Sequence, residues 1–173
     1  MKDKDKNELL ILLPKLRRYA YGLTGNKDSG DDLLHNSLEK ILKNFSYLKI
    51  INFQAYCYKV VSNAWKDELR KIIKIKVVSL DDEKINDTYE KHIHVDYENN
   101  YDQKKNYINV SKSINELSDK LKTTLLLSVV ENKTYNDISK ILNIPIGTVM
   151  SRINESRKIL KNKLLNGENN EYW

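Results

Sequence analysis

Apolar residues near the start of the chain recur every three or four positions, the spacing that places them on one face of an α-helix. The first stripe consists of Leu9, Leu13, Leu16, Ala20 and Leu23. Thr24, Gly25 and Asn26 follow it and predict the end of this helix. Pro14 lies inside the stripe and weighs against an unbroken helix, because proline cannot donate a backbone hydrogen bond.

Two further helices are predicted before residue 75. One runs from about Ser29 to Asn44, and its inward positions are expected to be Leu34, Leu38, Ile41 and Phe45. The next runs from about Phe53 to Ile73, and its buried positions are expected to be Tyr56 or Cys57, Val60, Ala64 and Leu69. Residues 46–52 between them are expected to form a loop. No strand pair interrupts the pattern, so the sequence predicts an all-α bundle.

A second periodic region begins near Ser111. One helix is predicted there from the apolar positions Ile114, Leu117, Leu121 and Leu125. Two short helices joined by a tight turn follow. Thr134 is expected to cap the first of them, and Asn143 is expected to supply the left-handed backbone of the turn.

A proline and a glycine then break the pattern, and the second short helix is expected to start at Thr148. Its inward face is expected to comprise Val149, Ile153, Leu160 and Leu164. A helix-turn-helix of this kind places its second helix in the major groove of DNA.

Charge divides the chain into three parts. Residues 1–76 carry 16 basic and 9 acidic side chains, a net +7, and residues 77–112 carry 5 and 8, a net −3. Residues 113–173 carry 9 and 7, a net +2, and the whole chain has a net charge of +6. Two basic segments around an acidic one suit two nucleic-acid-facing modules and a spacer. We therefore expect two small helical domains, 1–75 and 111–173, joined by a flexible polar linker, 76–110.

Catalytic and metal-binding chemistry find little support. Cys57 is the single cysteine, so neither an internal disulfide nor a cysteine metal cage can form. His92, His94 and Asp96 have a spacing that could hold a metal ion, but a third firm ligand is missing and a solvated linker explains them better. We expect no cofactor and no enzymatic activity. The start of the chain lacks an apolar signal core, which predicts a cytoplasmic protein.

The predicted third helix carries a second candidate surface. Asn63, Lys66, Asp67 and Arg70 lie three or four residues apart and hence on one helix face. By spacing alone, an ordinary solvated face explains them equally well. Aromatic residues nearby could stack on unpaired bases, although such residues more often belong to a core.

Taken together, these segments resemble a bacterial RNA polymerase sigma factor of the extracytoplasmic-function type, in the sigma-70 family. The stretches that carry the resemblance are Leu13–Ala20, Asp31–Leu38, Phe53–Arg70 and Gly147–Ile153. The family implies a non-catalytic subunit that binds core polymerase, at the β′ clamp helices and the β flap, and directs it to particular promoters. The N-terminal module would open the −10 element, and the C-terminal module would read the −35 element. An anti-sigma factor is a common partner in this family.

The resemblance also implies roles for individual positions. Contacts with core polymerase are implied for Asp32, Leu33, His35, Asn36 and Lys40. Contacts with the separated strand of the −10 element are implied for the loop that holds Ser46 and Tyr47 and for Asn63, Lys66 and Arg70. Contacts with the −35 duplex are implied for Thr148, Ser151, Arg152, Glu155 and Arg157. The family usually has Gln-Glu at His35-Asn36, so docking on the polymerase is expected to differ in detail.

Three other functions fit part of the pattern. A helix-turn-helix regulator that is not a polymerase subunit would explain the C-terminal module but not the match over Phe53–Arg70. A sigma-like decoy that titrates an anti-sigma partner would make the basic recognition helix superfluous. A nucleic-acid-processing enzyme would need a catalytic cluster, and none is obvious.

Overall fold

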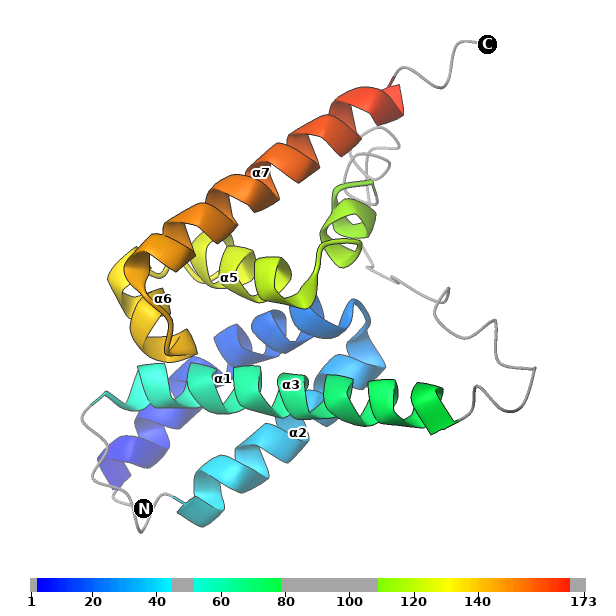
Figure 1. Ribbon diagram of the computed structural model, residues 1–173. Helices are drawn as coiled ribbons and strands as arrows, with labels where there is room; N and C mark the ends of the chain where they lie inside the picture. Colours follow the sequence, from blue (N-terminus) through cyan, green and yellow to red (C-terminus); the bar gives the residue numbers. More distant parts are fainter. Residues whose placement is uncertain (1–2, 45–51, 79–108, 169–173) are drawn as a thin grey trace, which may run out of the picture.

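Six helices of the computed structural model form two groups (Figure 1), and residues 3–44, 52–78 and 109–168 are described. The N-terminal group comprises α1 (Asp3–Thr24), α2 (Lys27–Asn44) and α3 (Phe53–Val78). The C-terminal group comprises α5 (Asp119–Val129), α6 (Tyr135–Leu142) and α7 (Ile146–Glu168), preceded by a helical segment at 109–115. Within these ranges there is no strand, which confirms the all-α prediction.

Helices α1 and α2 form a tight hairpin. Gly25, with φ of 79°, turns the chain, and the Asn26 side chain accepts a hydrogen bond from the Ser29 amide at 2.8 Å, which caps α2. Gly30 is buried against Tyr21, and a Cβ at Gly30 would lie 2.3 Å from the Tyr21 ring. The two helices can therefore approach this closely only because residue 30 has no side chain.

Helix α1 continues unbroken through Pro14, although this proline weighed against an unbroken helix in the sequence. Proline removes the hydrogen bond to the carbonyl four residues earlier, that of Leu10. Both Pro14 and Leu10 lie on the solvent side of α1. Water can satisfy the carbonyl that loses its partner there, so the helix continues.

The core of the N-terminal bundle follows the predicted stripes with local shifts. Of the predicted α1 positions all but Leu13 are buried, while Leu12 and Tyr19 join the core without having been predicted. In α3 the buried residue is Cys57 rather than Tyr56, and Val61 is more deeply buried than Val60. The predicted position Phe45 lies outside the described residues.

The C-terminal group contains the predicted helix-turn-helix. Thr134 caps α6 by accepting a hydrogen bond from the Asp137 amide at 3.2 Å, and Asn143 ends it with φ of 55°. Helix α7 starts at Ile146, two residues earlier than predicted. The prediction of one continuous helix over Ile114–Leu125 was wrong. Residues 116–118 are not helical, so they separate the helical segment 109–115 from α5.

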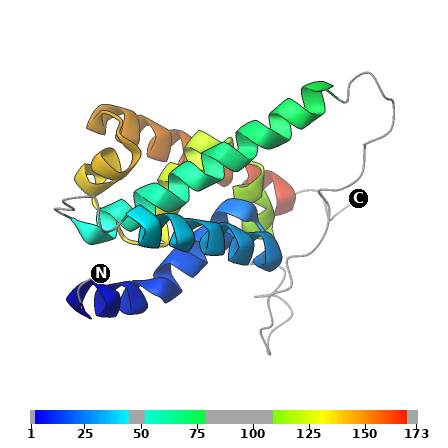
Figure 2. The same ribbon diagram turned by 90° about the horizontal axis from the view of Figure 1, so that it is seen from below.

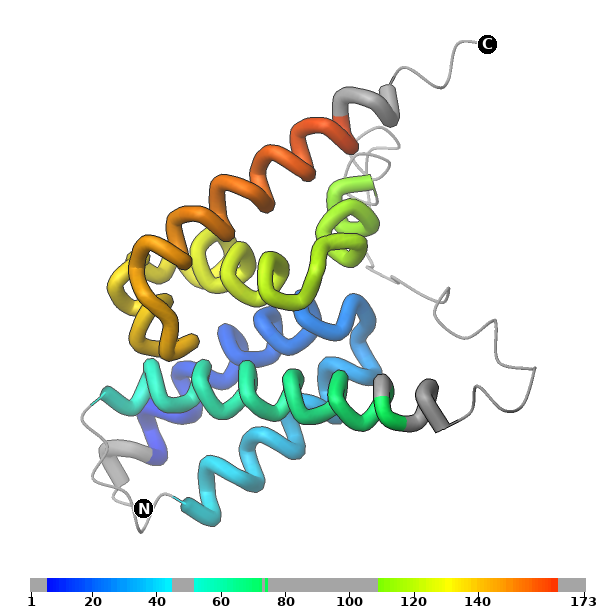
Figure 3. Tube along the Cα trace, in the orientation of Figure 1, coloured from blue at the N-terminus to red at the C-terminus, as the bar shows by residue number. Residues whose placement is uncertain are grey.

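Both groups share one apolar core. Helix α5 packs on α1, and α6 packs on the N-terminal half of α3 (Figure 3). Leu126 of α5 fits against Gly22 of α1, where a Cβ would lie 3.0 Å from the leucine methyl groups. A further link is the Lys122 ammonium, which lies 3.5 Å from the Leu23 carbonyl at the end of α1. The described parts of the two modules therefore form one compact body.

Candidate nucleic-acid interface

Helix α7 presents a continuous polar face to solvent. Val149, Ile153 and Ser156 are fully buried and fix which side of the helix points inward. On the other side lie the exposed residues Met150, Ser151, Asn154, Glu155 and Lys158. We call these five residues the α7 outer face. Because α7 is the second helix of a helix-turn-helix, this is the face that can enter a DNA groove.

The residues predicted to contact the −35 duplex divide into two groups. Ser151, Glu155 and Arg157 are exposed, whereas Thr148 and Arg152 are only partly exposed and lie on the flank of α7. Met150 and Asn154 belong to the outer face but were not predicted. Their signal in the sequence was helical spacing: Asn154 lies three residues after Ser151, and Met150 lies one turn before Asn154.

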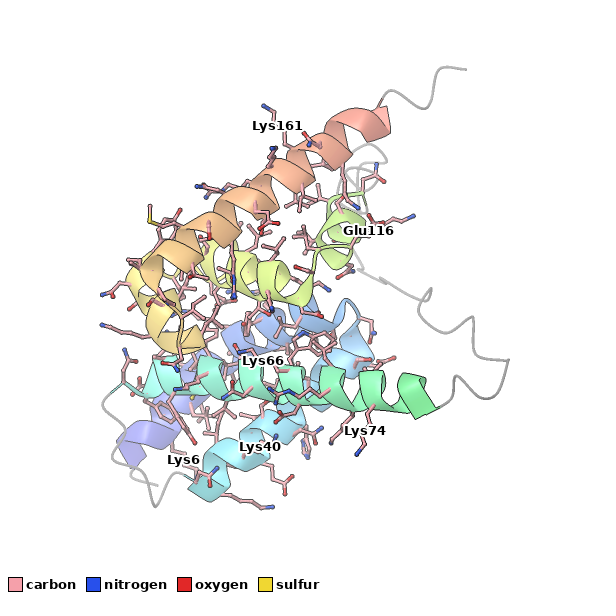
Figure 4. All side chains as sticks on the ribbon, viewed as in Figure 1. Lys6, Lys40, Lys66, Lys74, Glu116 and Lys161 are labelled. Carbon is pink, nitrogen blue, oxygen red and sulfur yellow. The ribbon has the colours of Figure 1, made fainter. Side chains whose placement is uncertain are left out.

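Helix α3 carries the predicted −10 surface. Asn63, Lys66 and Arg70 are all exposed, as expected. The pKa of Lys66 is lowered, first by partial burial and then by the positive charges of Arg152 and Arg70. Figure 4 shows Lys66 on the side of α3 that faces the C-terminal helices. Lys66 of the predicted −10 surface therefore lies near Arg152 on the flank of α7.

Ion pairs hold part of this surface in place. The Arg70 guanidinium lies 3.0 Å from the Asp67 carboxylate, and the Lys40 ammonium of α2 lies 3.9 Å from the other oxygen of Asp67. Both pairs are solvent-accessible, so each contributes little to stability. Arg70 can exchange Asp67 for a phosphate at small cost.

A groove of about 310 Å³ lies along the junction of α2 and α3. Asn36 and Lys40 line it together with Asp67 and Glu68. Figure 2 shows the two helices side by side, with the C-terminal group behind them. Burial raises the pKa of Glu68, and a hydrogen bond with Asn36 opposes this. Two of the residues predicted to bind polymerase thus lie in one charged groove.

The remaining predicted polymerase contacts differ in exposure. Asp32 and His35 are exposed on α2 next to the groove. Leu33 is fully buried in the bundle core, so its side chain cannot make the predicted contact in this arrangement. Leu33 turns inward because it belongs, with its neighbour Leu34, to the apolar stripe of α2.

A buried polar cluster joins the two modules. The Tyr58 hydroxyl of α3 donates a hydrogen bond of 2.5 Å to the Glu131 carboxylate, which follows α5. Arg18 of α1 lies 3.8 Å from the other carboxylate oxygen, which has no hydrogen-bond partner. Burial raises the pKa of Glu131, and the Tyr58 hydrogen bond and the Arg18 charge oppose this. The Lys133 ammonium lies 4.7 Å from the centre of the Tyr58 ring.

Two predicted groups cannot be placed. Ser46 and Tyr47 lie outside the described residues, as do His92, His94 and Asp96. Among the residues that the structure describes, no cluster of three His, Cys, Asp or Glu side chains could hold a metal ion. In the same part of the chain no helix combines the length and apolar character that a membrane crossing requires.

Two sequence families match this chain. The "Sigma2 domain of PhyR" matches residues 10–52, and "Sigma-70, region 4" matches residues 108–160. The second match contains the complete helix-turn-helix and the outer face of α7. The first covers most of α1 and α2.

Curated relatives agree with these families. The chain is 24% identical over 167 residues to the "ECF RNA polymerase sigma factor EcfG" of Rhodopseudomonas palustris, covering 91% of this chain and 83% of the relative. It is 40% identical over 55 residues to the "ECF RNA polymerase sigma-E factor" of Haemophilus influenzae, covering 32% of this chain and 29% of the relative.

Solved structures extend the likeness to the whole described fold. The sigma factor RpoE of Bartonella quintana, solved in complex with the anti-sigma factor NepR, has a TM-score of 0.76 and 27% sequence identity. The match covers 95% of this chain and 98% of RpoE, so the arrangement of both modules is similar. The anti-anti-sigma factor PhyR of the same organism, at 17% identity and a TM-score of 0.60, shares the fold.

Sigma factors are DNA-binding regulators rather than enzymes. Matches to both conserved regions, in the same order and on the two helical modules, lead to one assignment. The chain belongs to the extracytoplasmic-function group of the sigma-70 family and is an alternative sigma factor that directs the initiation of transcription.

Proposed function

We propose that this sigma factor binds core RNA polymerase through its N-terminal module and brings two DNA-reading helices to one promoter. The observation that supports this most strongly is the pairing of α3 and α7. Each exposes a polar face with basic side chains, and the two belong to different modules. A regulator that reads a single operator needs only one such helix.

The N-terminal module, residues 1–75 in our division, would bind the polymerase and open the −10 element. Asp32, His35, Asn36 and Lys40 form an exposed polar surface along α2 suited to a charged partner helix. Asn63, Lys66 and Arg70 would hold the separated strand, since cationic side chains track a phosphate backbone. Leu33 would act by fixing α2 in place.

The C-terminal module, residues 111–173, would read the −35 element as a duplex. Ser151 and Glu155 lie on the outer face of α7, where Glu155 could accept a hydrogen bond from a cytosine amino group. Arg157 suits a phosphate or a guanine, and Thr148 and Arg152, which are partly exposed on the flank of α7, would lie near the groove wall.

Promoter spacing requires the two modules to separate. Elements named −10 and −35 lie about 25 base pairs apart, roughly 85 Å along straight DNA. Helix α3, with 26 residues, is only about 39 Å long, and α6 of the other module packs directly on it. A segment of 30 residues connects α3 to the helix at 109–115, and such a chain spans up to about 100 Å when extended.

An anti-sigma factor is the second proposed partner. The similar sigma factor RpoE was solved with the anti-sigma factor NepR, and both modules of this chain are arranged as in that complex. An antagonist that binds the compact form would keep the modules together by mass action. Because both partners act where transcription occurs, we place the protein in the cytoplasm.

Transcription from defined components tests the proposal. Purified protein and core polymerase that lacks a sigma subunit should together start transcripts at fixed positions on genomic DNA fragments, with shared sequences upstream of the starts. A helix-turn-helix regulator would bind DNA but start no transcripts unaided. A decoy would bind an anti-sigma factor and neither bind nor use promoters. Either result would refute the polymerase role.

A further inference from the structure

Two large apolar side chains lie exposed at the start of α7. Ile146 is 49% exposed and Met150 is 48% exposed, and they are one helical turn apart. Single exposed apolar residues are common on protein surfaces and need no function. These two, however, lie in the first turns of the recognition helix, which is the part that approaches base edges in a helix-turn-helix complex.

The surroundings of this pair favour contact with a base rather than with a phosphate. Residues 146–151 contain no charged side chain. Arg152, the first cation of α7, lies on the flank beside Lys66. At Gly147 no atom lies within 4 Å of where a Cβ would be, so the first turn is open to a close approach.

The major groove offers one apolar group, the C5-methyl of thymine. A side chain that enters the groove without charge or hydrogen-bond donors finds its matching surface there. Met150 lies at the edge of the outer face, one helical turn before Asn154, and its flexible thioether can adapt to the methyl group. Ile146 lies one turn before it, towards the start of the helix.

We propose that Met150, supported by Ile146, determines sequence specificity by contacting the methyl group of a thymine in the −35 element. This inference rests on the proposed reading of −35 DNA by α7. It adds an apolar base contact from two residues that were not predicted from the sequence to contact the −35 element.

Replacement of thymine by uracil tests the contact, because uracil pairs like thymine but lacks the methyl group. Duplexes that the full-length protein selects from a random pool define the site. Each thymine in that site is then replaced in turn, and binding is measured by fluorescence anisotropy at fixed salt. At one or two adjacent positions the substitution should weaken binding about three- to fivefold, the effect of removing one buried methyl group.

In Met150→Ala the same positions should show almost no difference between thymine and uracil. Val129→Ala is the matched control, because Val129 is an exposed apolar residue of the same module but lies on α5. It should retain the full thymine-to-uracil ratio. Met150→Leu should retain most of it, and thermal melts check that all variants fold.

The outcomes are distinguishable. If no replacement weakens binding, or if the effect persists in Met150→Ala, the thymine contact is wrong although −35 reading by α7 can stand. Loss of anti-sigma binding in Met150→Ala, with an unchanged thymine-to-uracil ratio, would assign the apolar pair to a protein partner and also refute the contact. If the protein selects no sequence at all, the proposed −35 function itself fails.

Discussion

The contact between the two modules depends on the buried carboxylate of Glu131. One oxygen has a short hydrogen bond from Tyr58, and the other has only the guanidinium of Arg18 at ion-pair distance. A buried acceptor without a partner costs more than an average hydrogen bond contributes. The hydrogen bond from Tyr58 therefore offsets part of the cost of burying this carboxylate.

Loss of the Tyr58 hydroxyl should lower the stability of the compact form. In Tyr58→Phe the ring still fills its place against Tyr19, but both Glu131 oxygens are left without a donor. We expect the free energy of unfolding in urea to fall by about 1–3 kcal/mol. Tyr21→Phe is the control, because its hydrogen bond to Asp31 is open to solvent and should be worth under about 1 kcal/mol. Equal losses in both variants would show that the buried position has no special role.

Glu131 also predicts a pH dependence. Burial raises its pKa above the ordinary value of 4.5 in the folded protein, so the folded state takes up this proton more readily than the unfolded state. The ionised group therefore opposes folding at neutral pH, and this penalty fades as the pH falls through the folded pKa towards 4.5. The positive charges of Arg18, Lys133 and Lys15 oppose the shift without cancelling it.

Glu131→Gln should remove this dependence, because glutamine stays neutral and its carbonyl still accepts from Tyr58. We expect the stability of the variant relative to the wild type to be highest at pH 7 and to decrease towards pH 5, measured by urea unfolding. Glu39→Gln is the control of opposite sign, since a hydrogen bond from Lys43 lowers the pKa of Glu39. A pH-independent difference for Glu131→Gln would mean that Glu131 is not desolvated.

At the scale of elements, the α1–α2 hairpin depends on one missing side chain. Gly30 lies under the Tyr21 ring, and a Cβ there would also come within 3.1 Å of the Tyr21 Cα atom. The Tyr21 ring can rotate away from an added Cβ, but the backbone of α1 cannot shift without disturbing the side chains packed around it. Gly30 therefore sets the distance between α1 and α2, and with it the position of the α2 residues for which polymerase contacts are proposed.

Gly30→Ala should therefore lower the free energy of unfolding by about 1–3 kcal/mol through overpacking. Gly147→Ala provides the matched control, because Gly147 is also helical and has open space where the Cβ would be. It should gain up to about 1 kcal/mol from helix propensity. Thermal or urea unfolding of both variants distinguishes close packing from a general effect of alanine.

Local signals predicted most of the elements. Thr134 and Asn143 marked the ends of α6 because a cap and a left-handed residue depend on near neighbours. The stripe of α1 was predicted for the same reason. The sequence could not show that Leu33 is buried. Leu33 lies at the edge of the apolar stripe of α2, and whether a residue at such an edge is buried depends on the helix that packs against it.

The C-terminal site was predicted in outline and shifted in detail. A stripe read from Val149 and Ile153 identified the inward side of α7 correctly. Arg152 was expected on the outer face, yet it lies on the flank, because it is three residues after buried Val149 and four before buried Ser156, so that helical spacing places it beside the inward face. Met150 was overlooked because an apolar side chain in a periodic helix is usually taken for core.

At the scale of the whole molecule, the compact form and the promoter-bound form have to differ. One core runs through both modules, with α5 on α1 and α6 on α3. In the proposed promoter complex the modules would instead lie tens of ångströms apart. Binding to polymerase and DNA would then have to supply the free energy that separates them.

Fluorescence energy transfer can follow this separation. Lys74→Cys at the end of α3 and Lys161→Cys in α7 place dyes on exposed positions of the two modules. Native Cys57 should not react, because it is fully buried and burial, followed by the charge of Glu8, raises its pKa to about 12. Transfer should be high in the free protein and fall when core polymerase and promoter DNA are added. Unchanged transfer would exclude an opening on the promoter.

The shared core also bears on protein synthesis. The helices that complete the N-terminal bundle leave the ribosome well before α5 and α6, so Leu126 and Ile138 are not yet available to cover α1 and α3. During that interval the nascent chain exposes an apolar surface to which a chaperone or another copy of the chain could bind. The proposed opening on the promoter would expose the same surface again, so a polymerase that stabilises the open form would be expected to cover it with non-polar side chains.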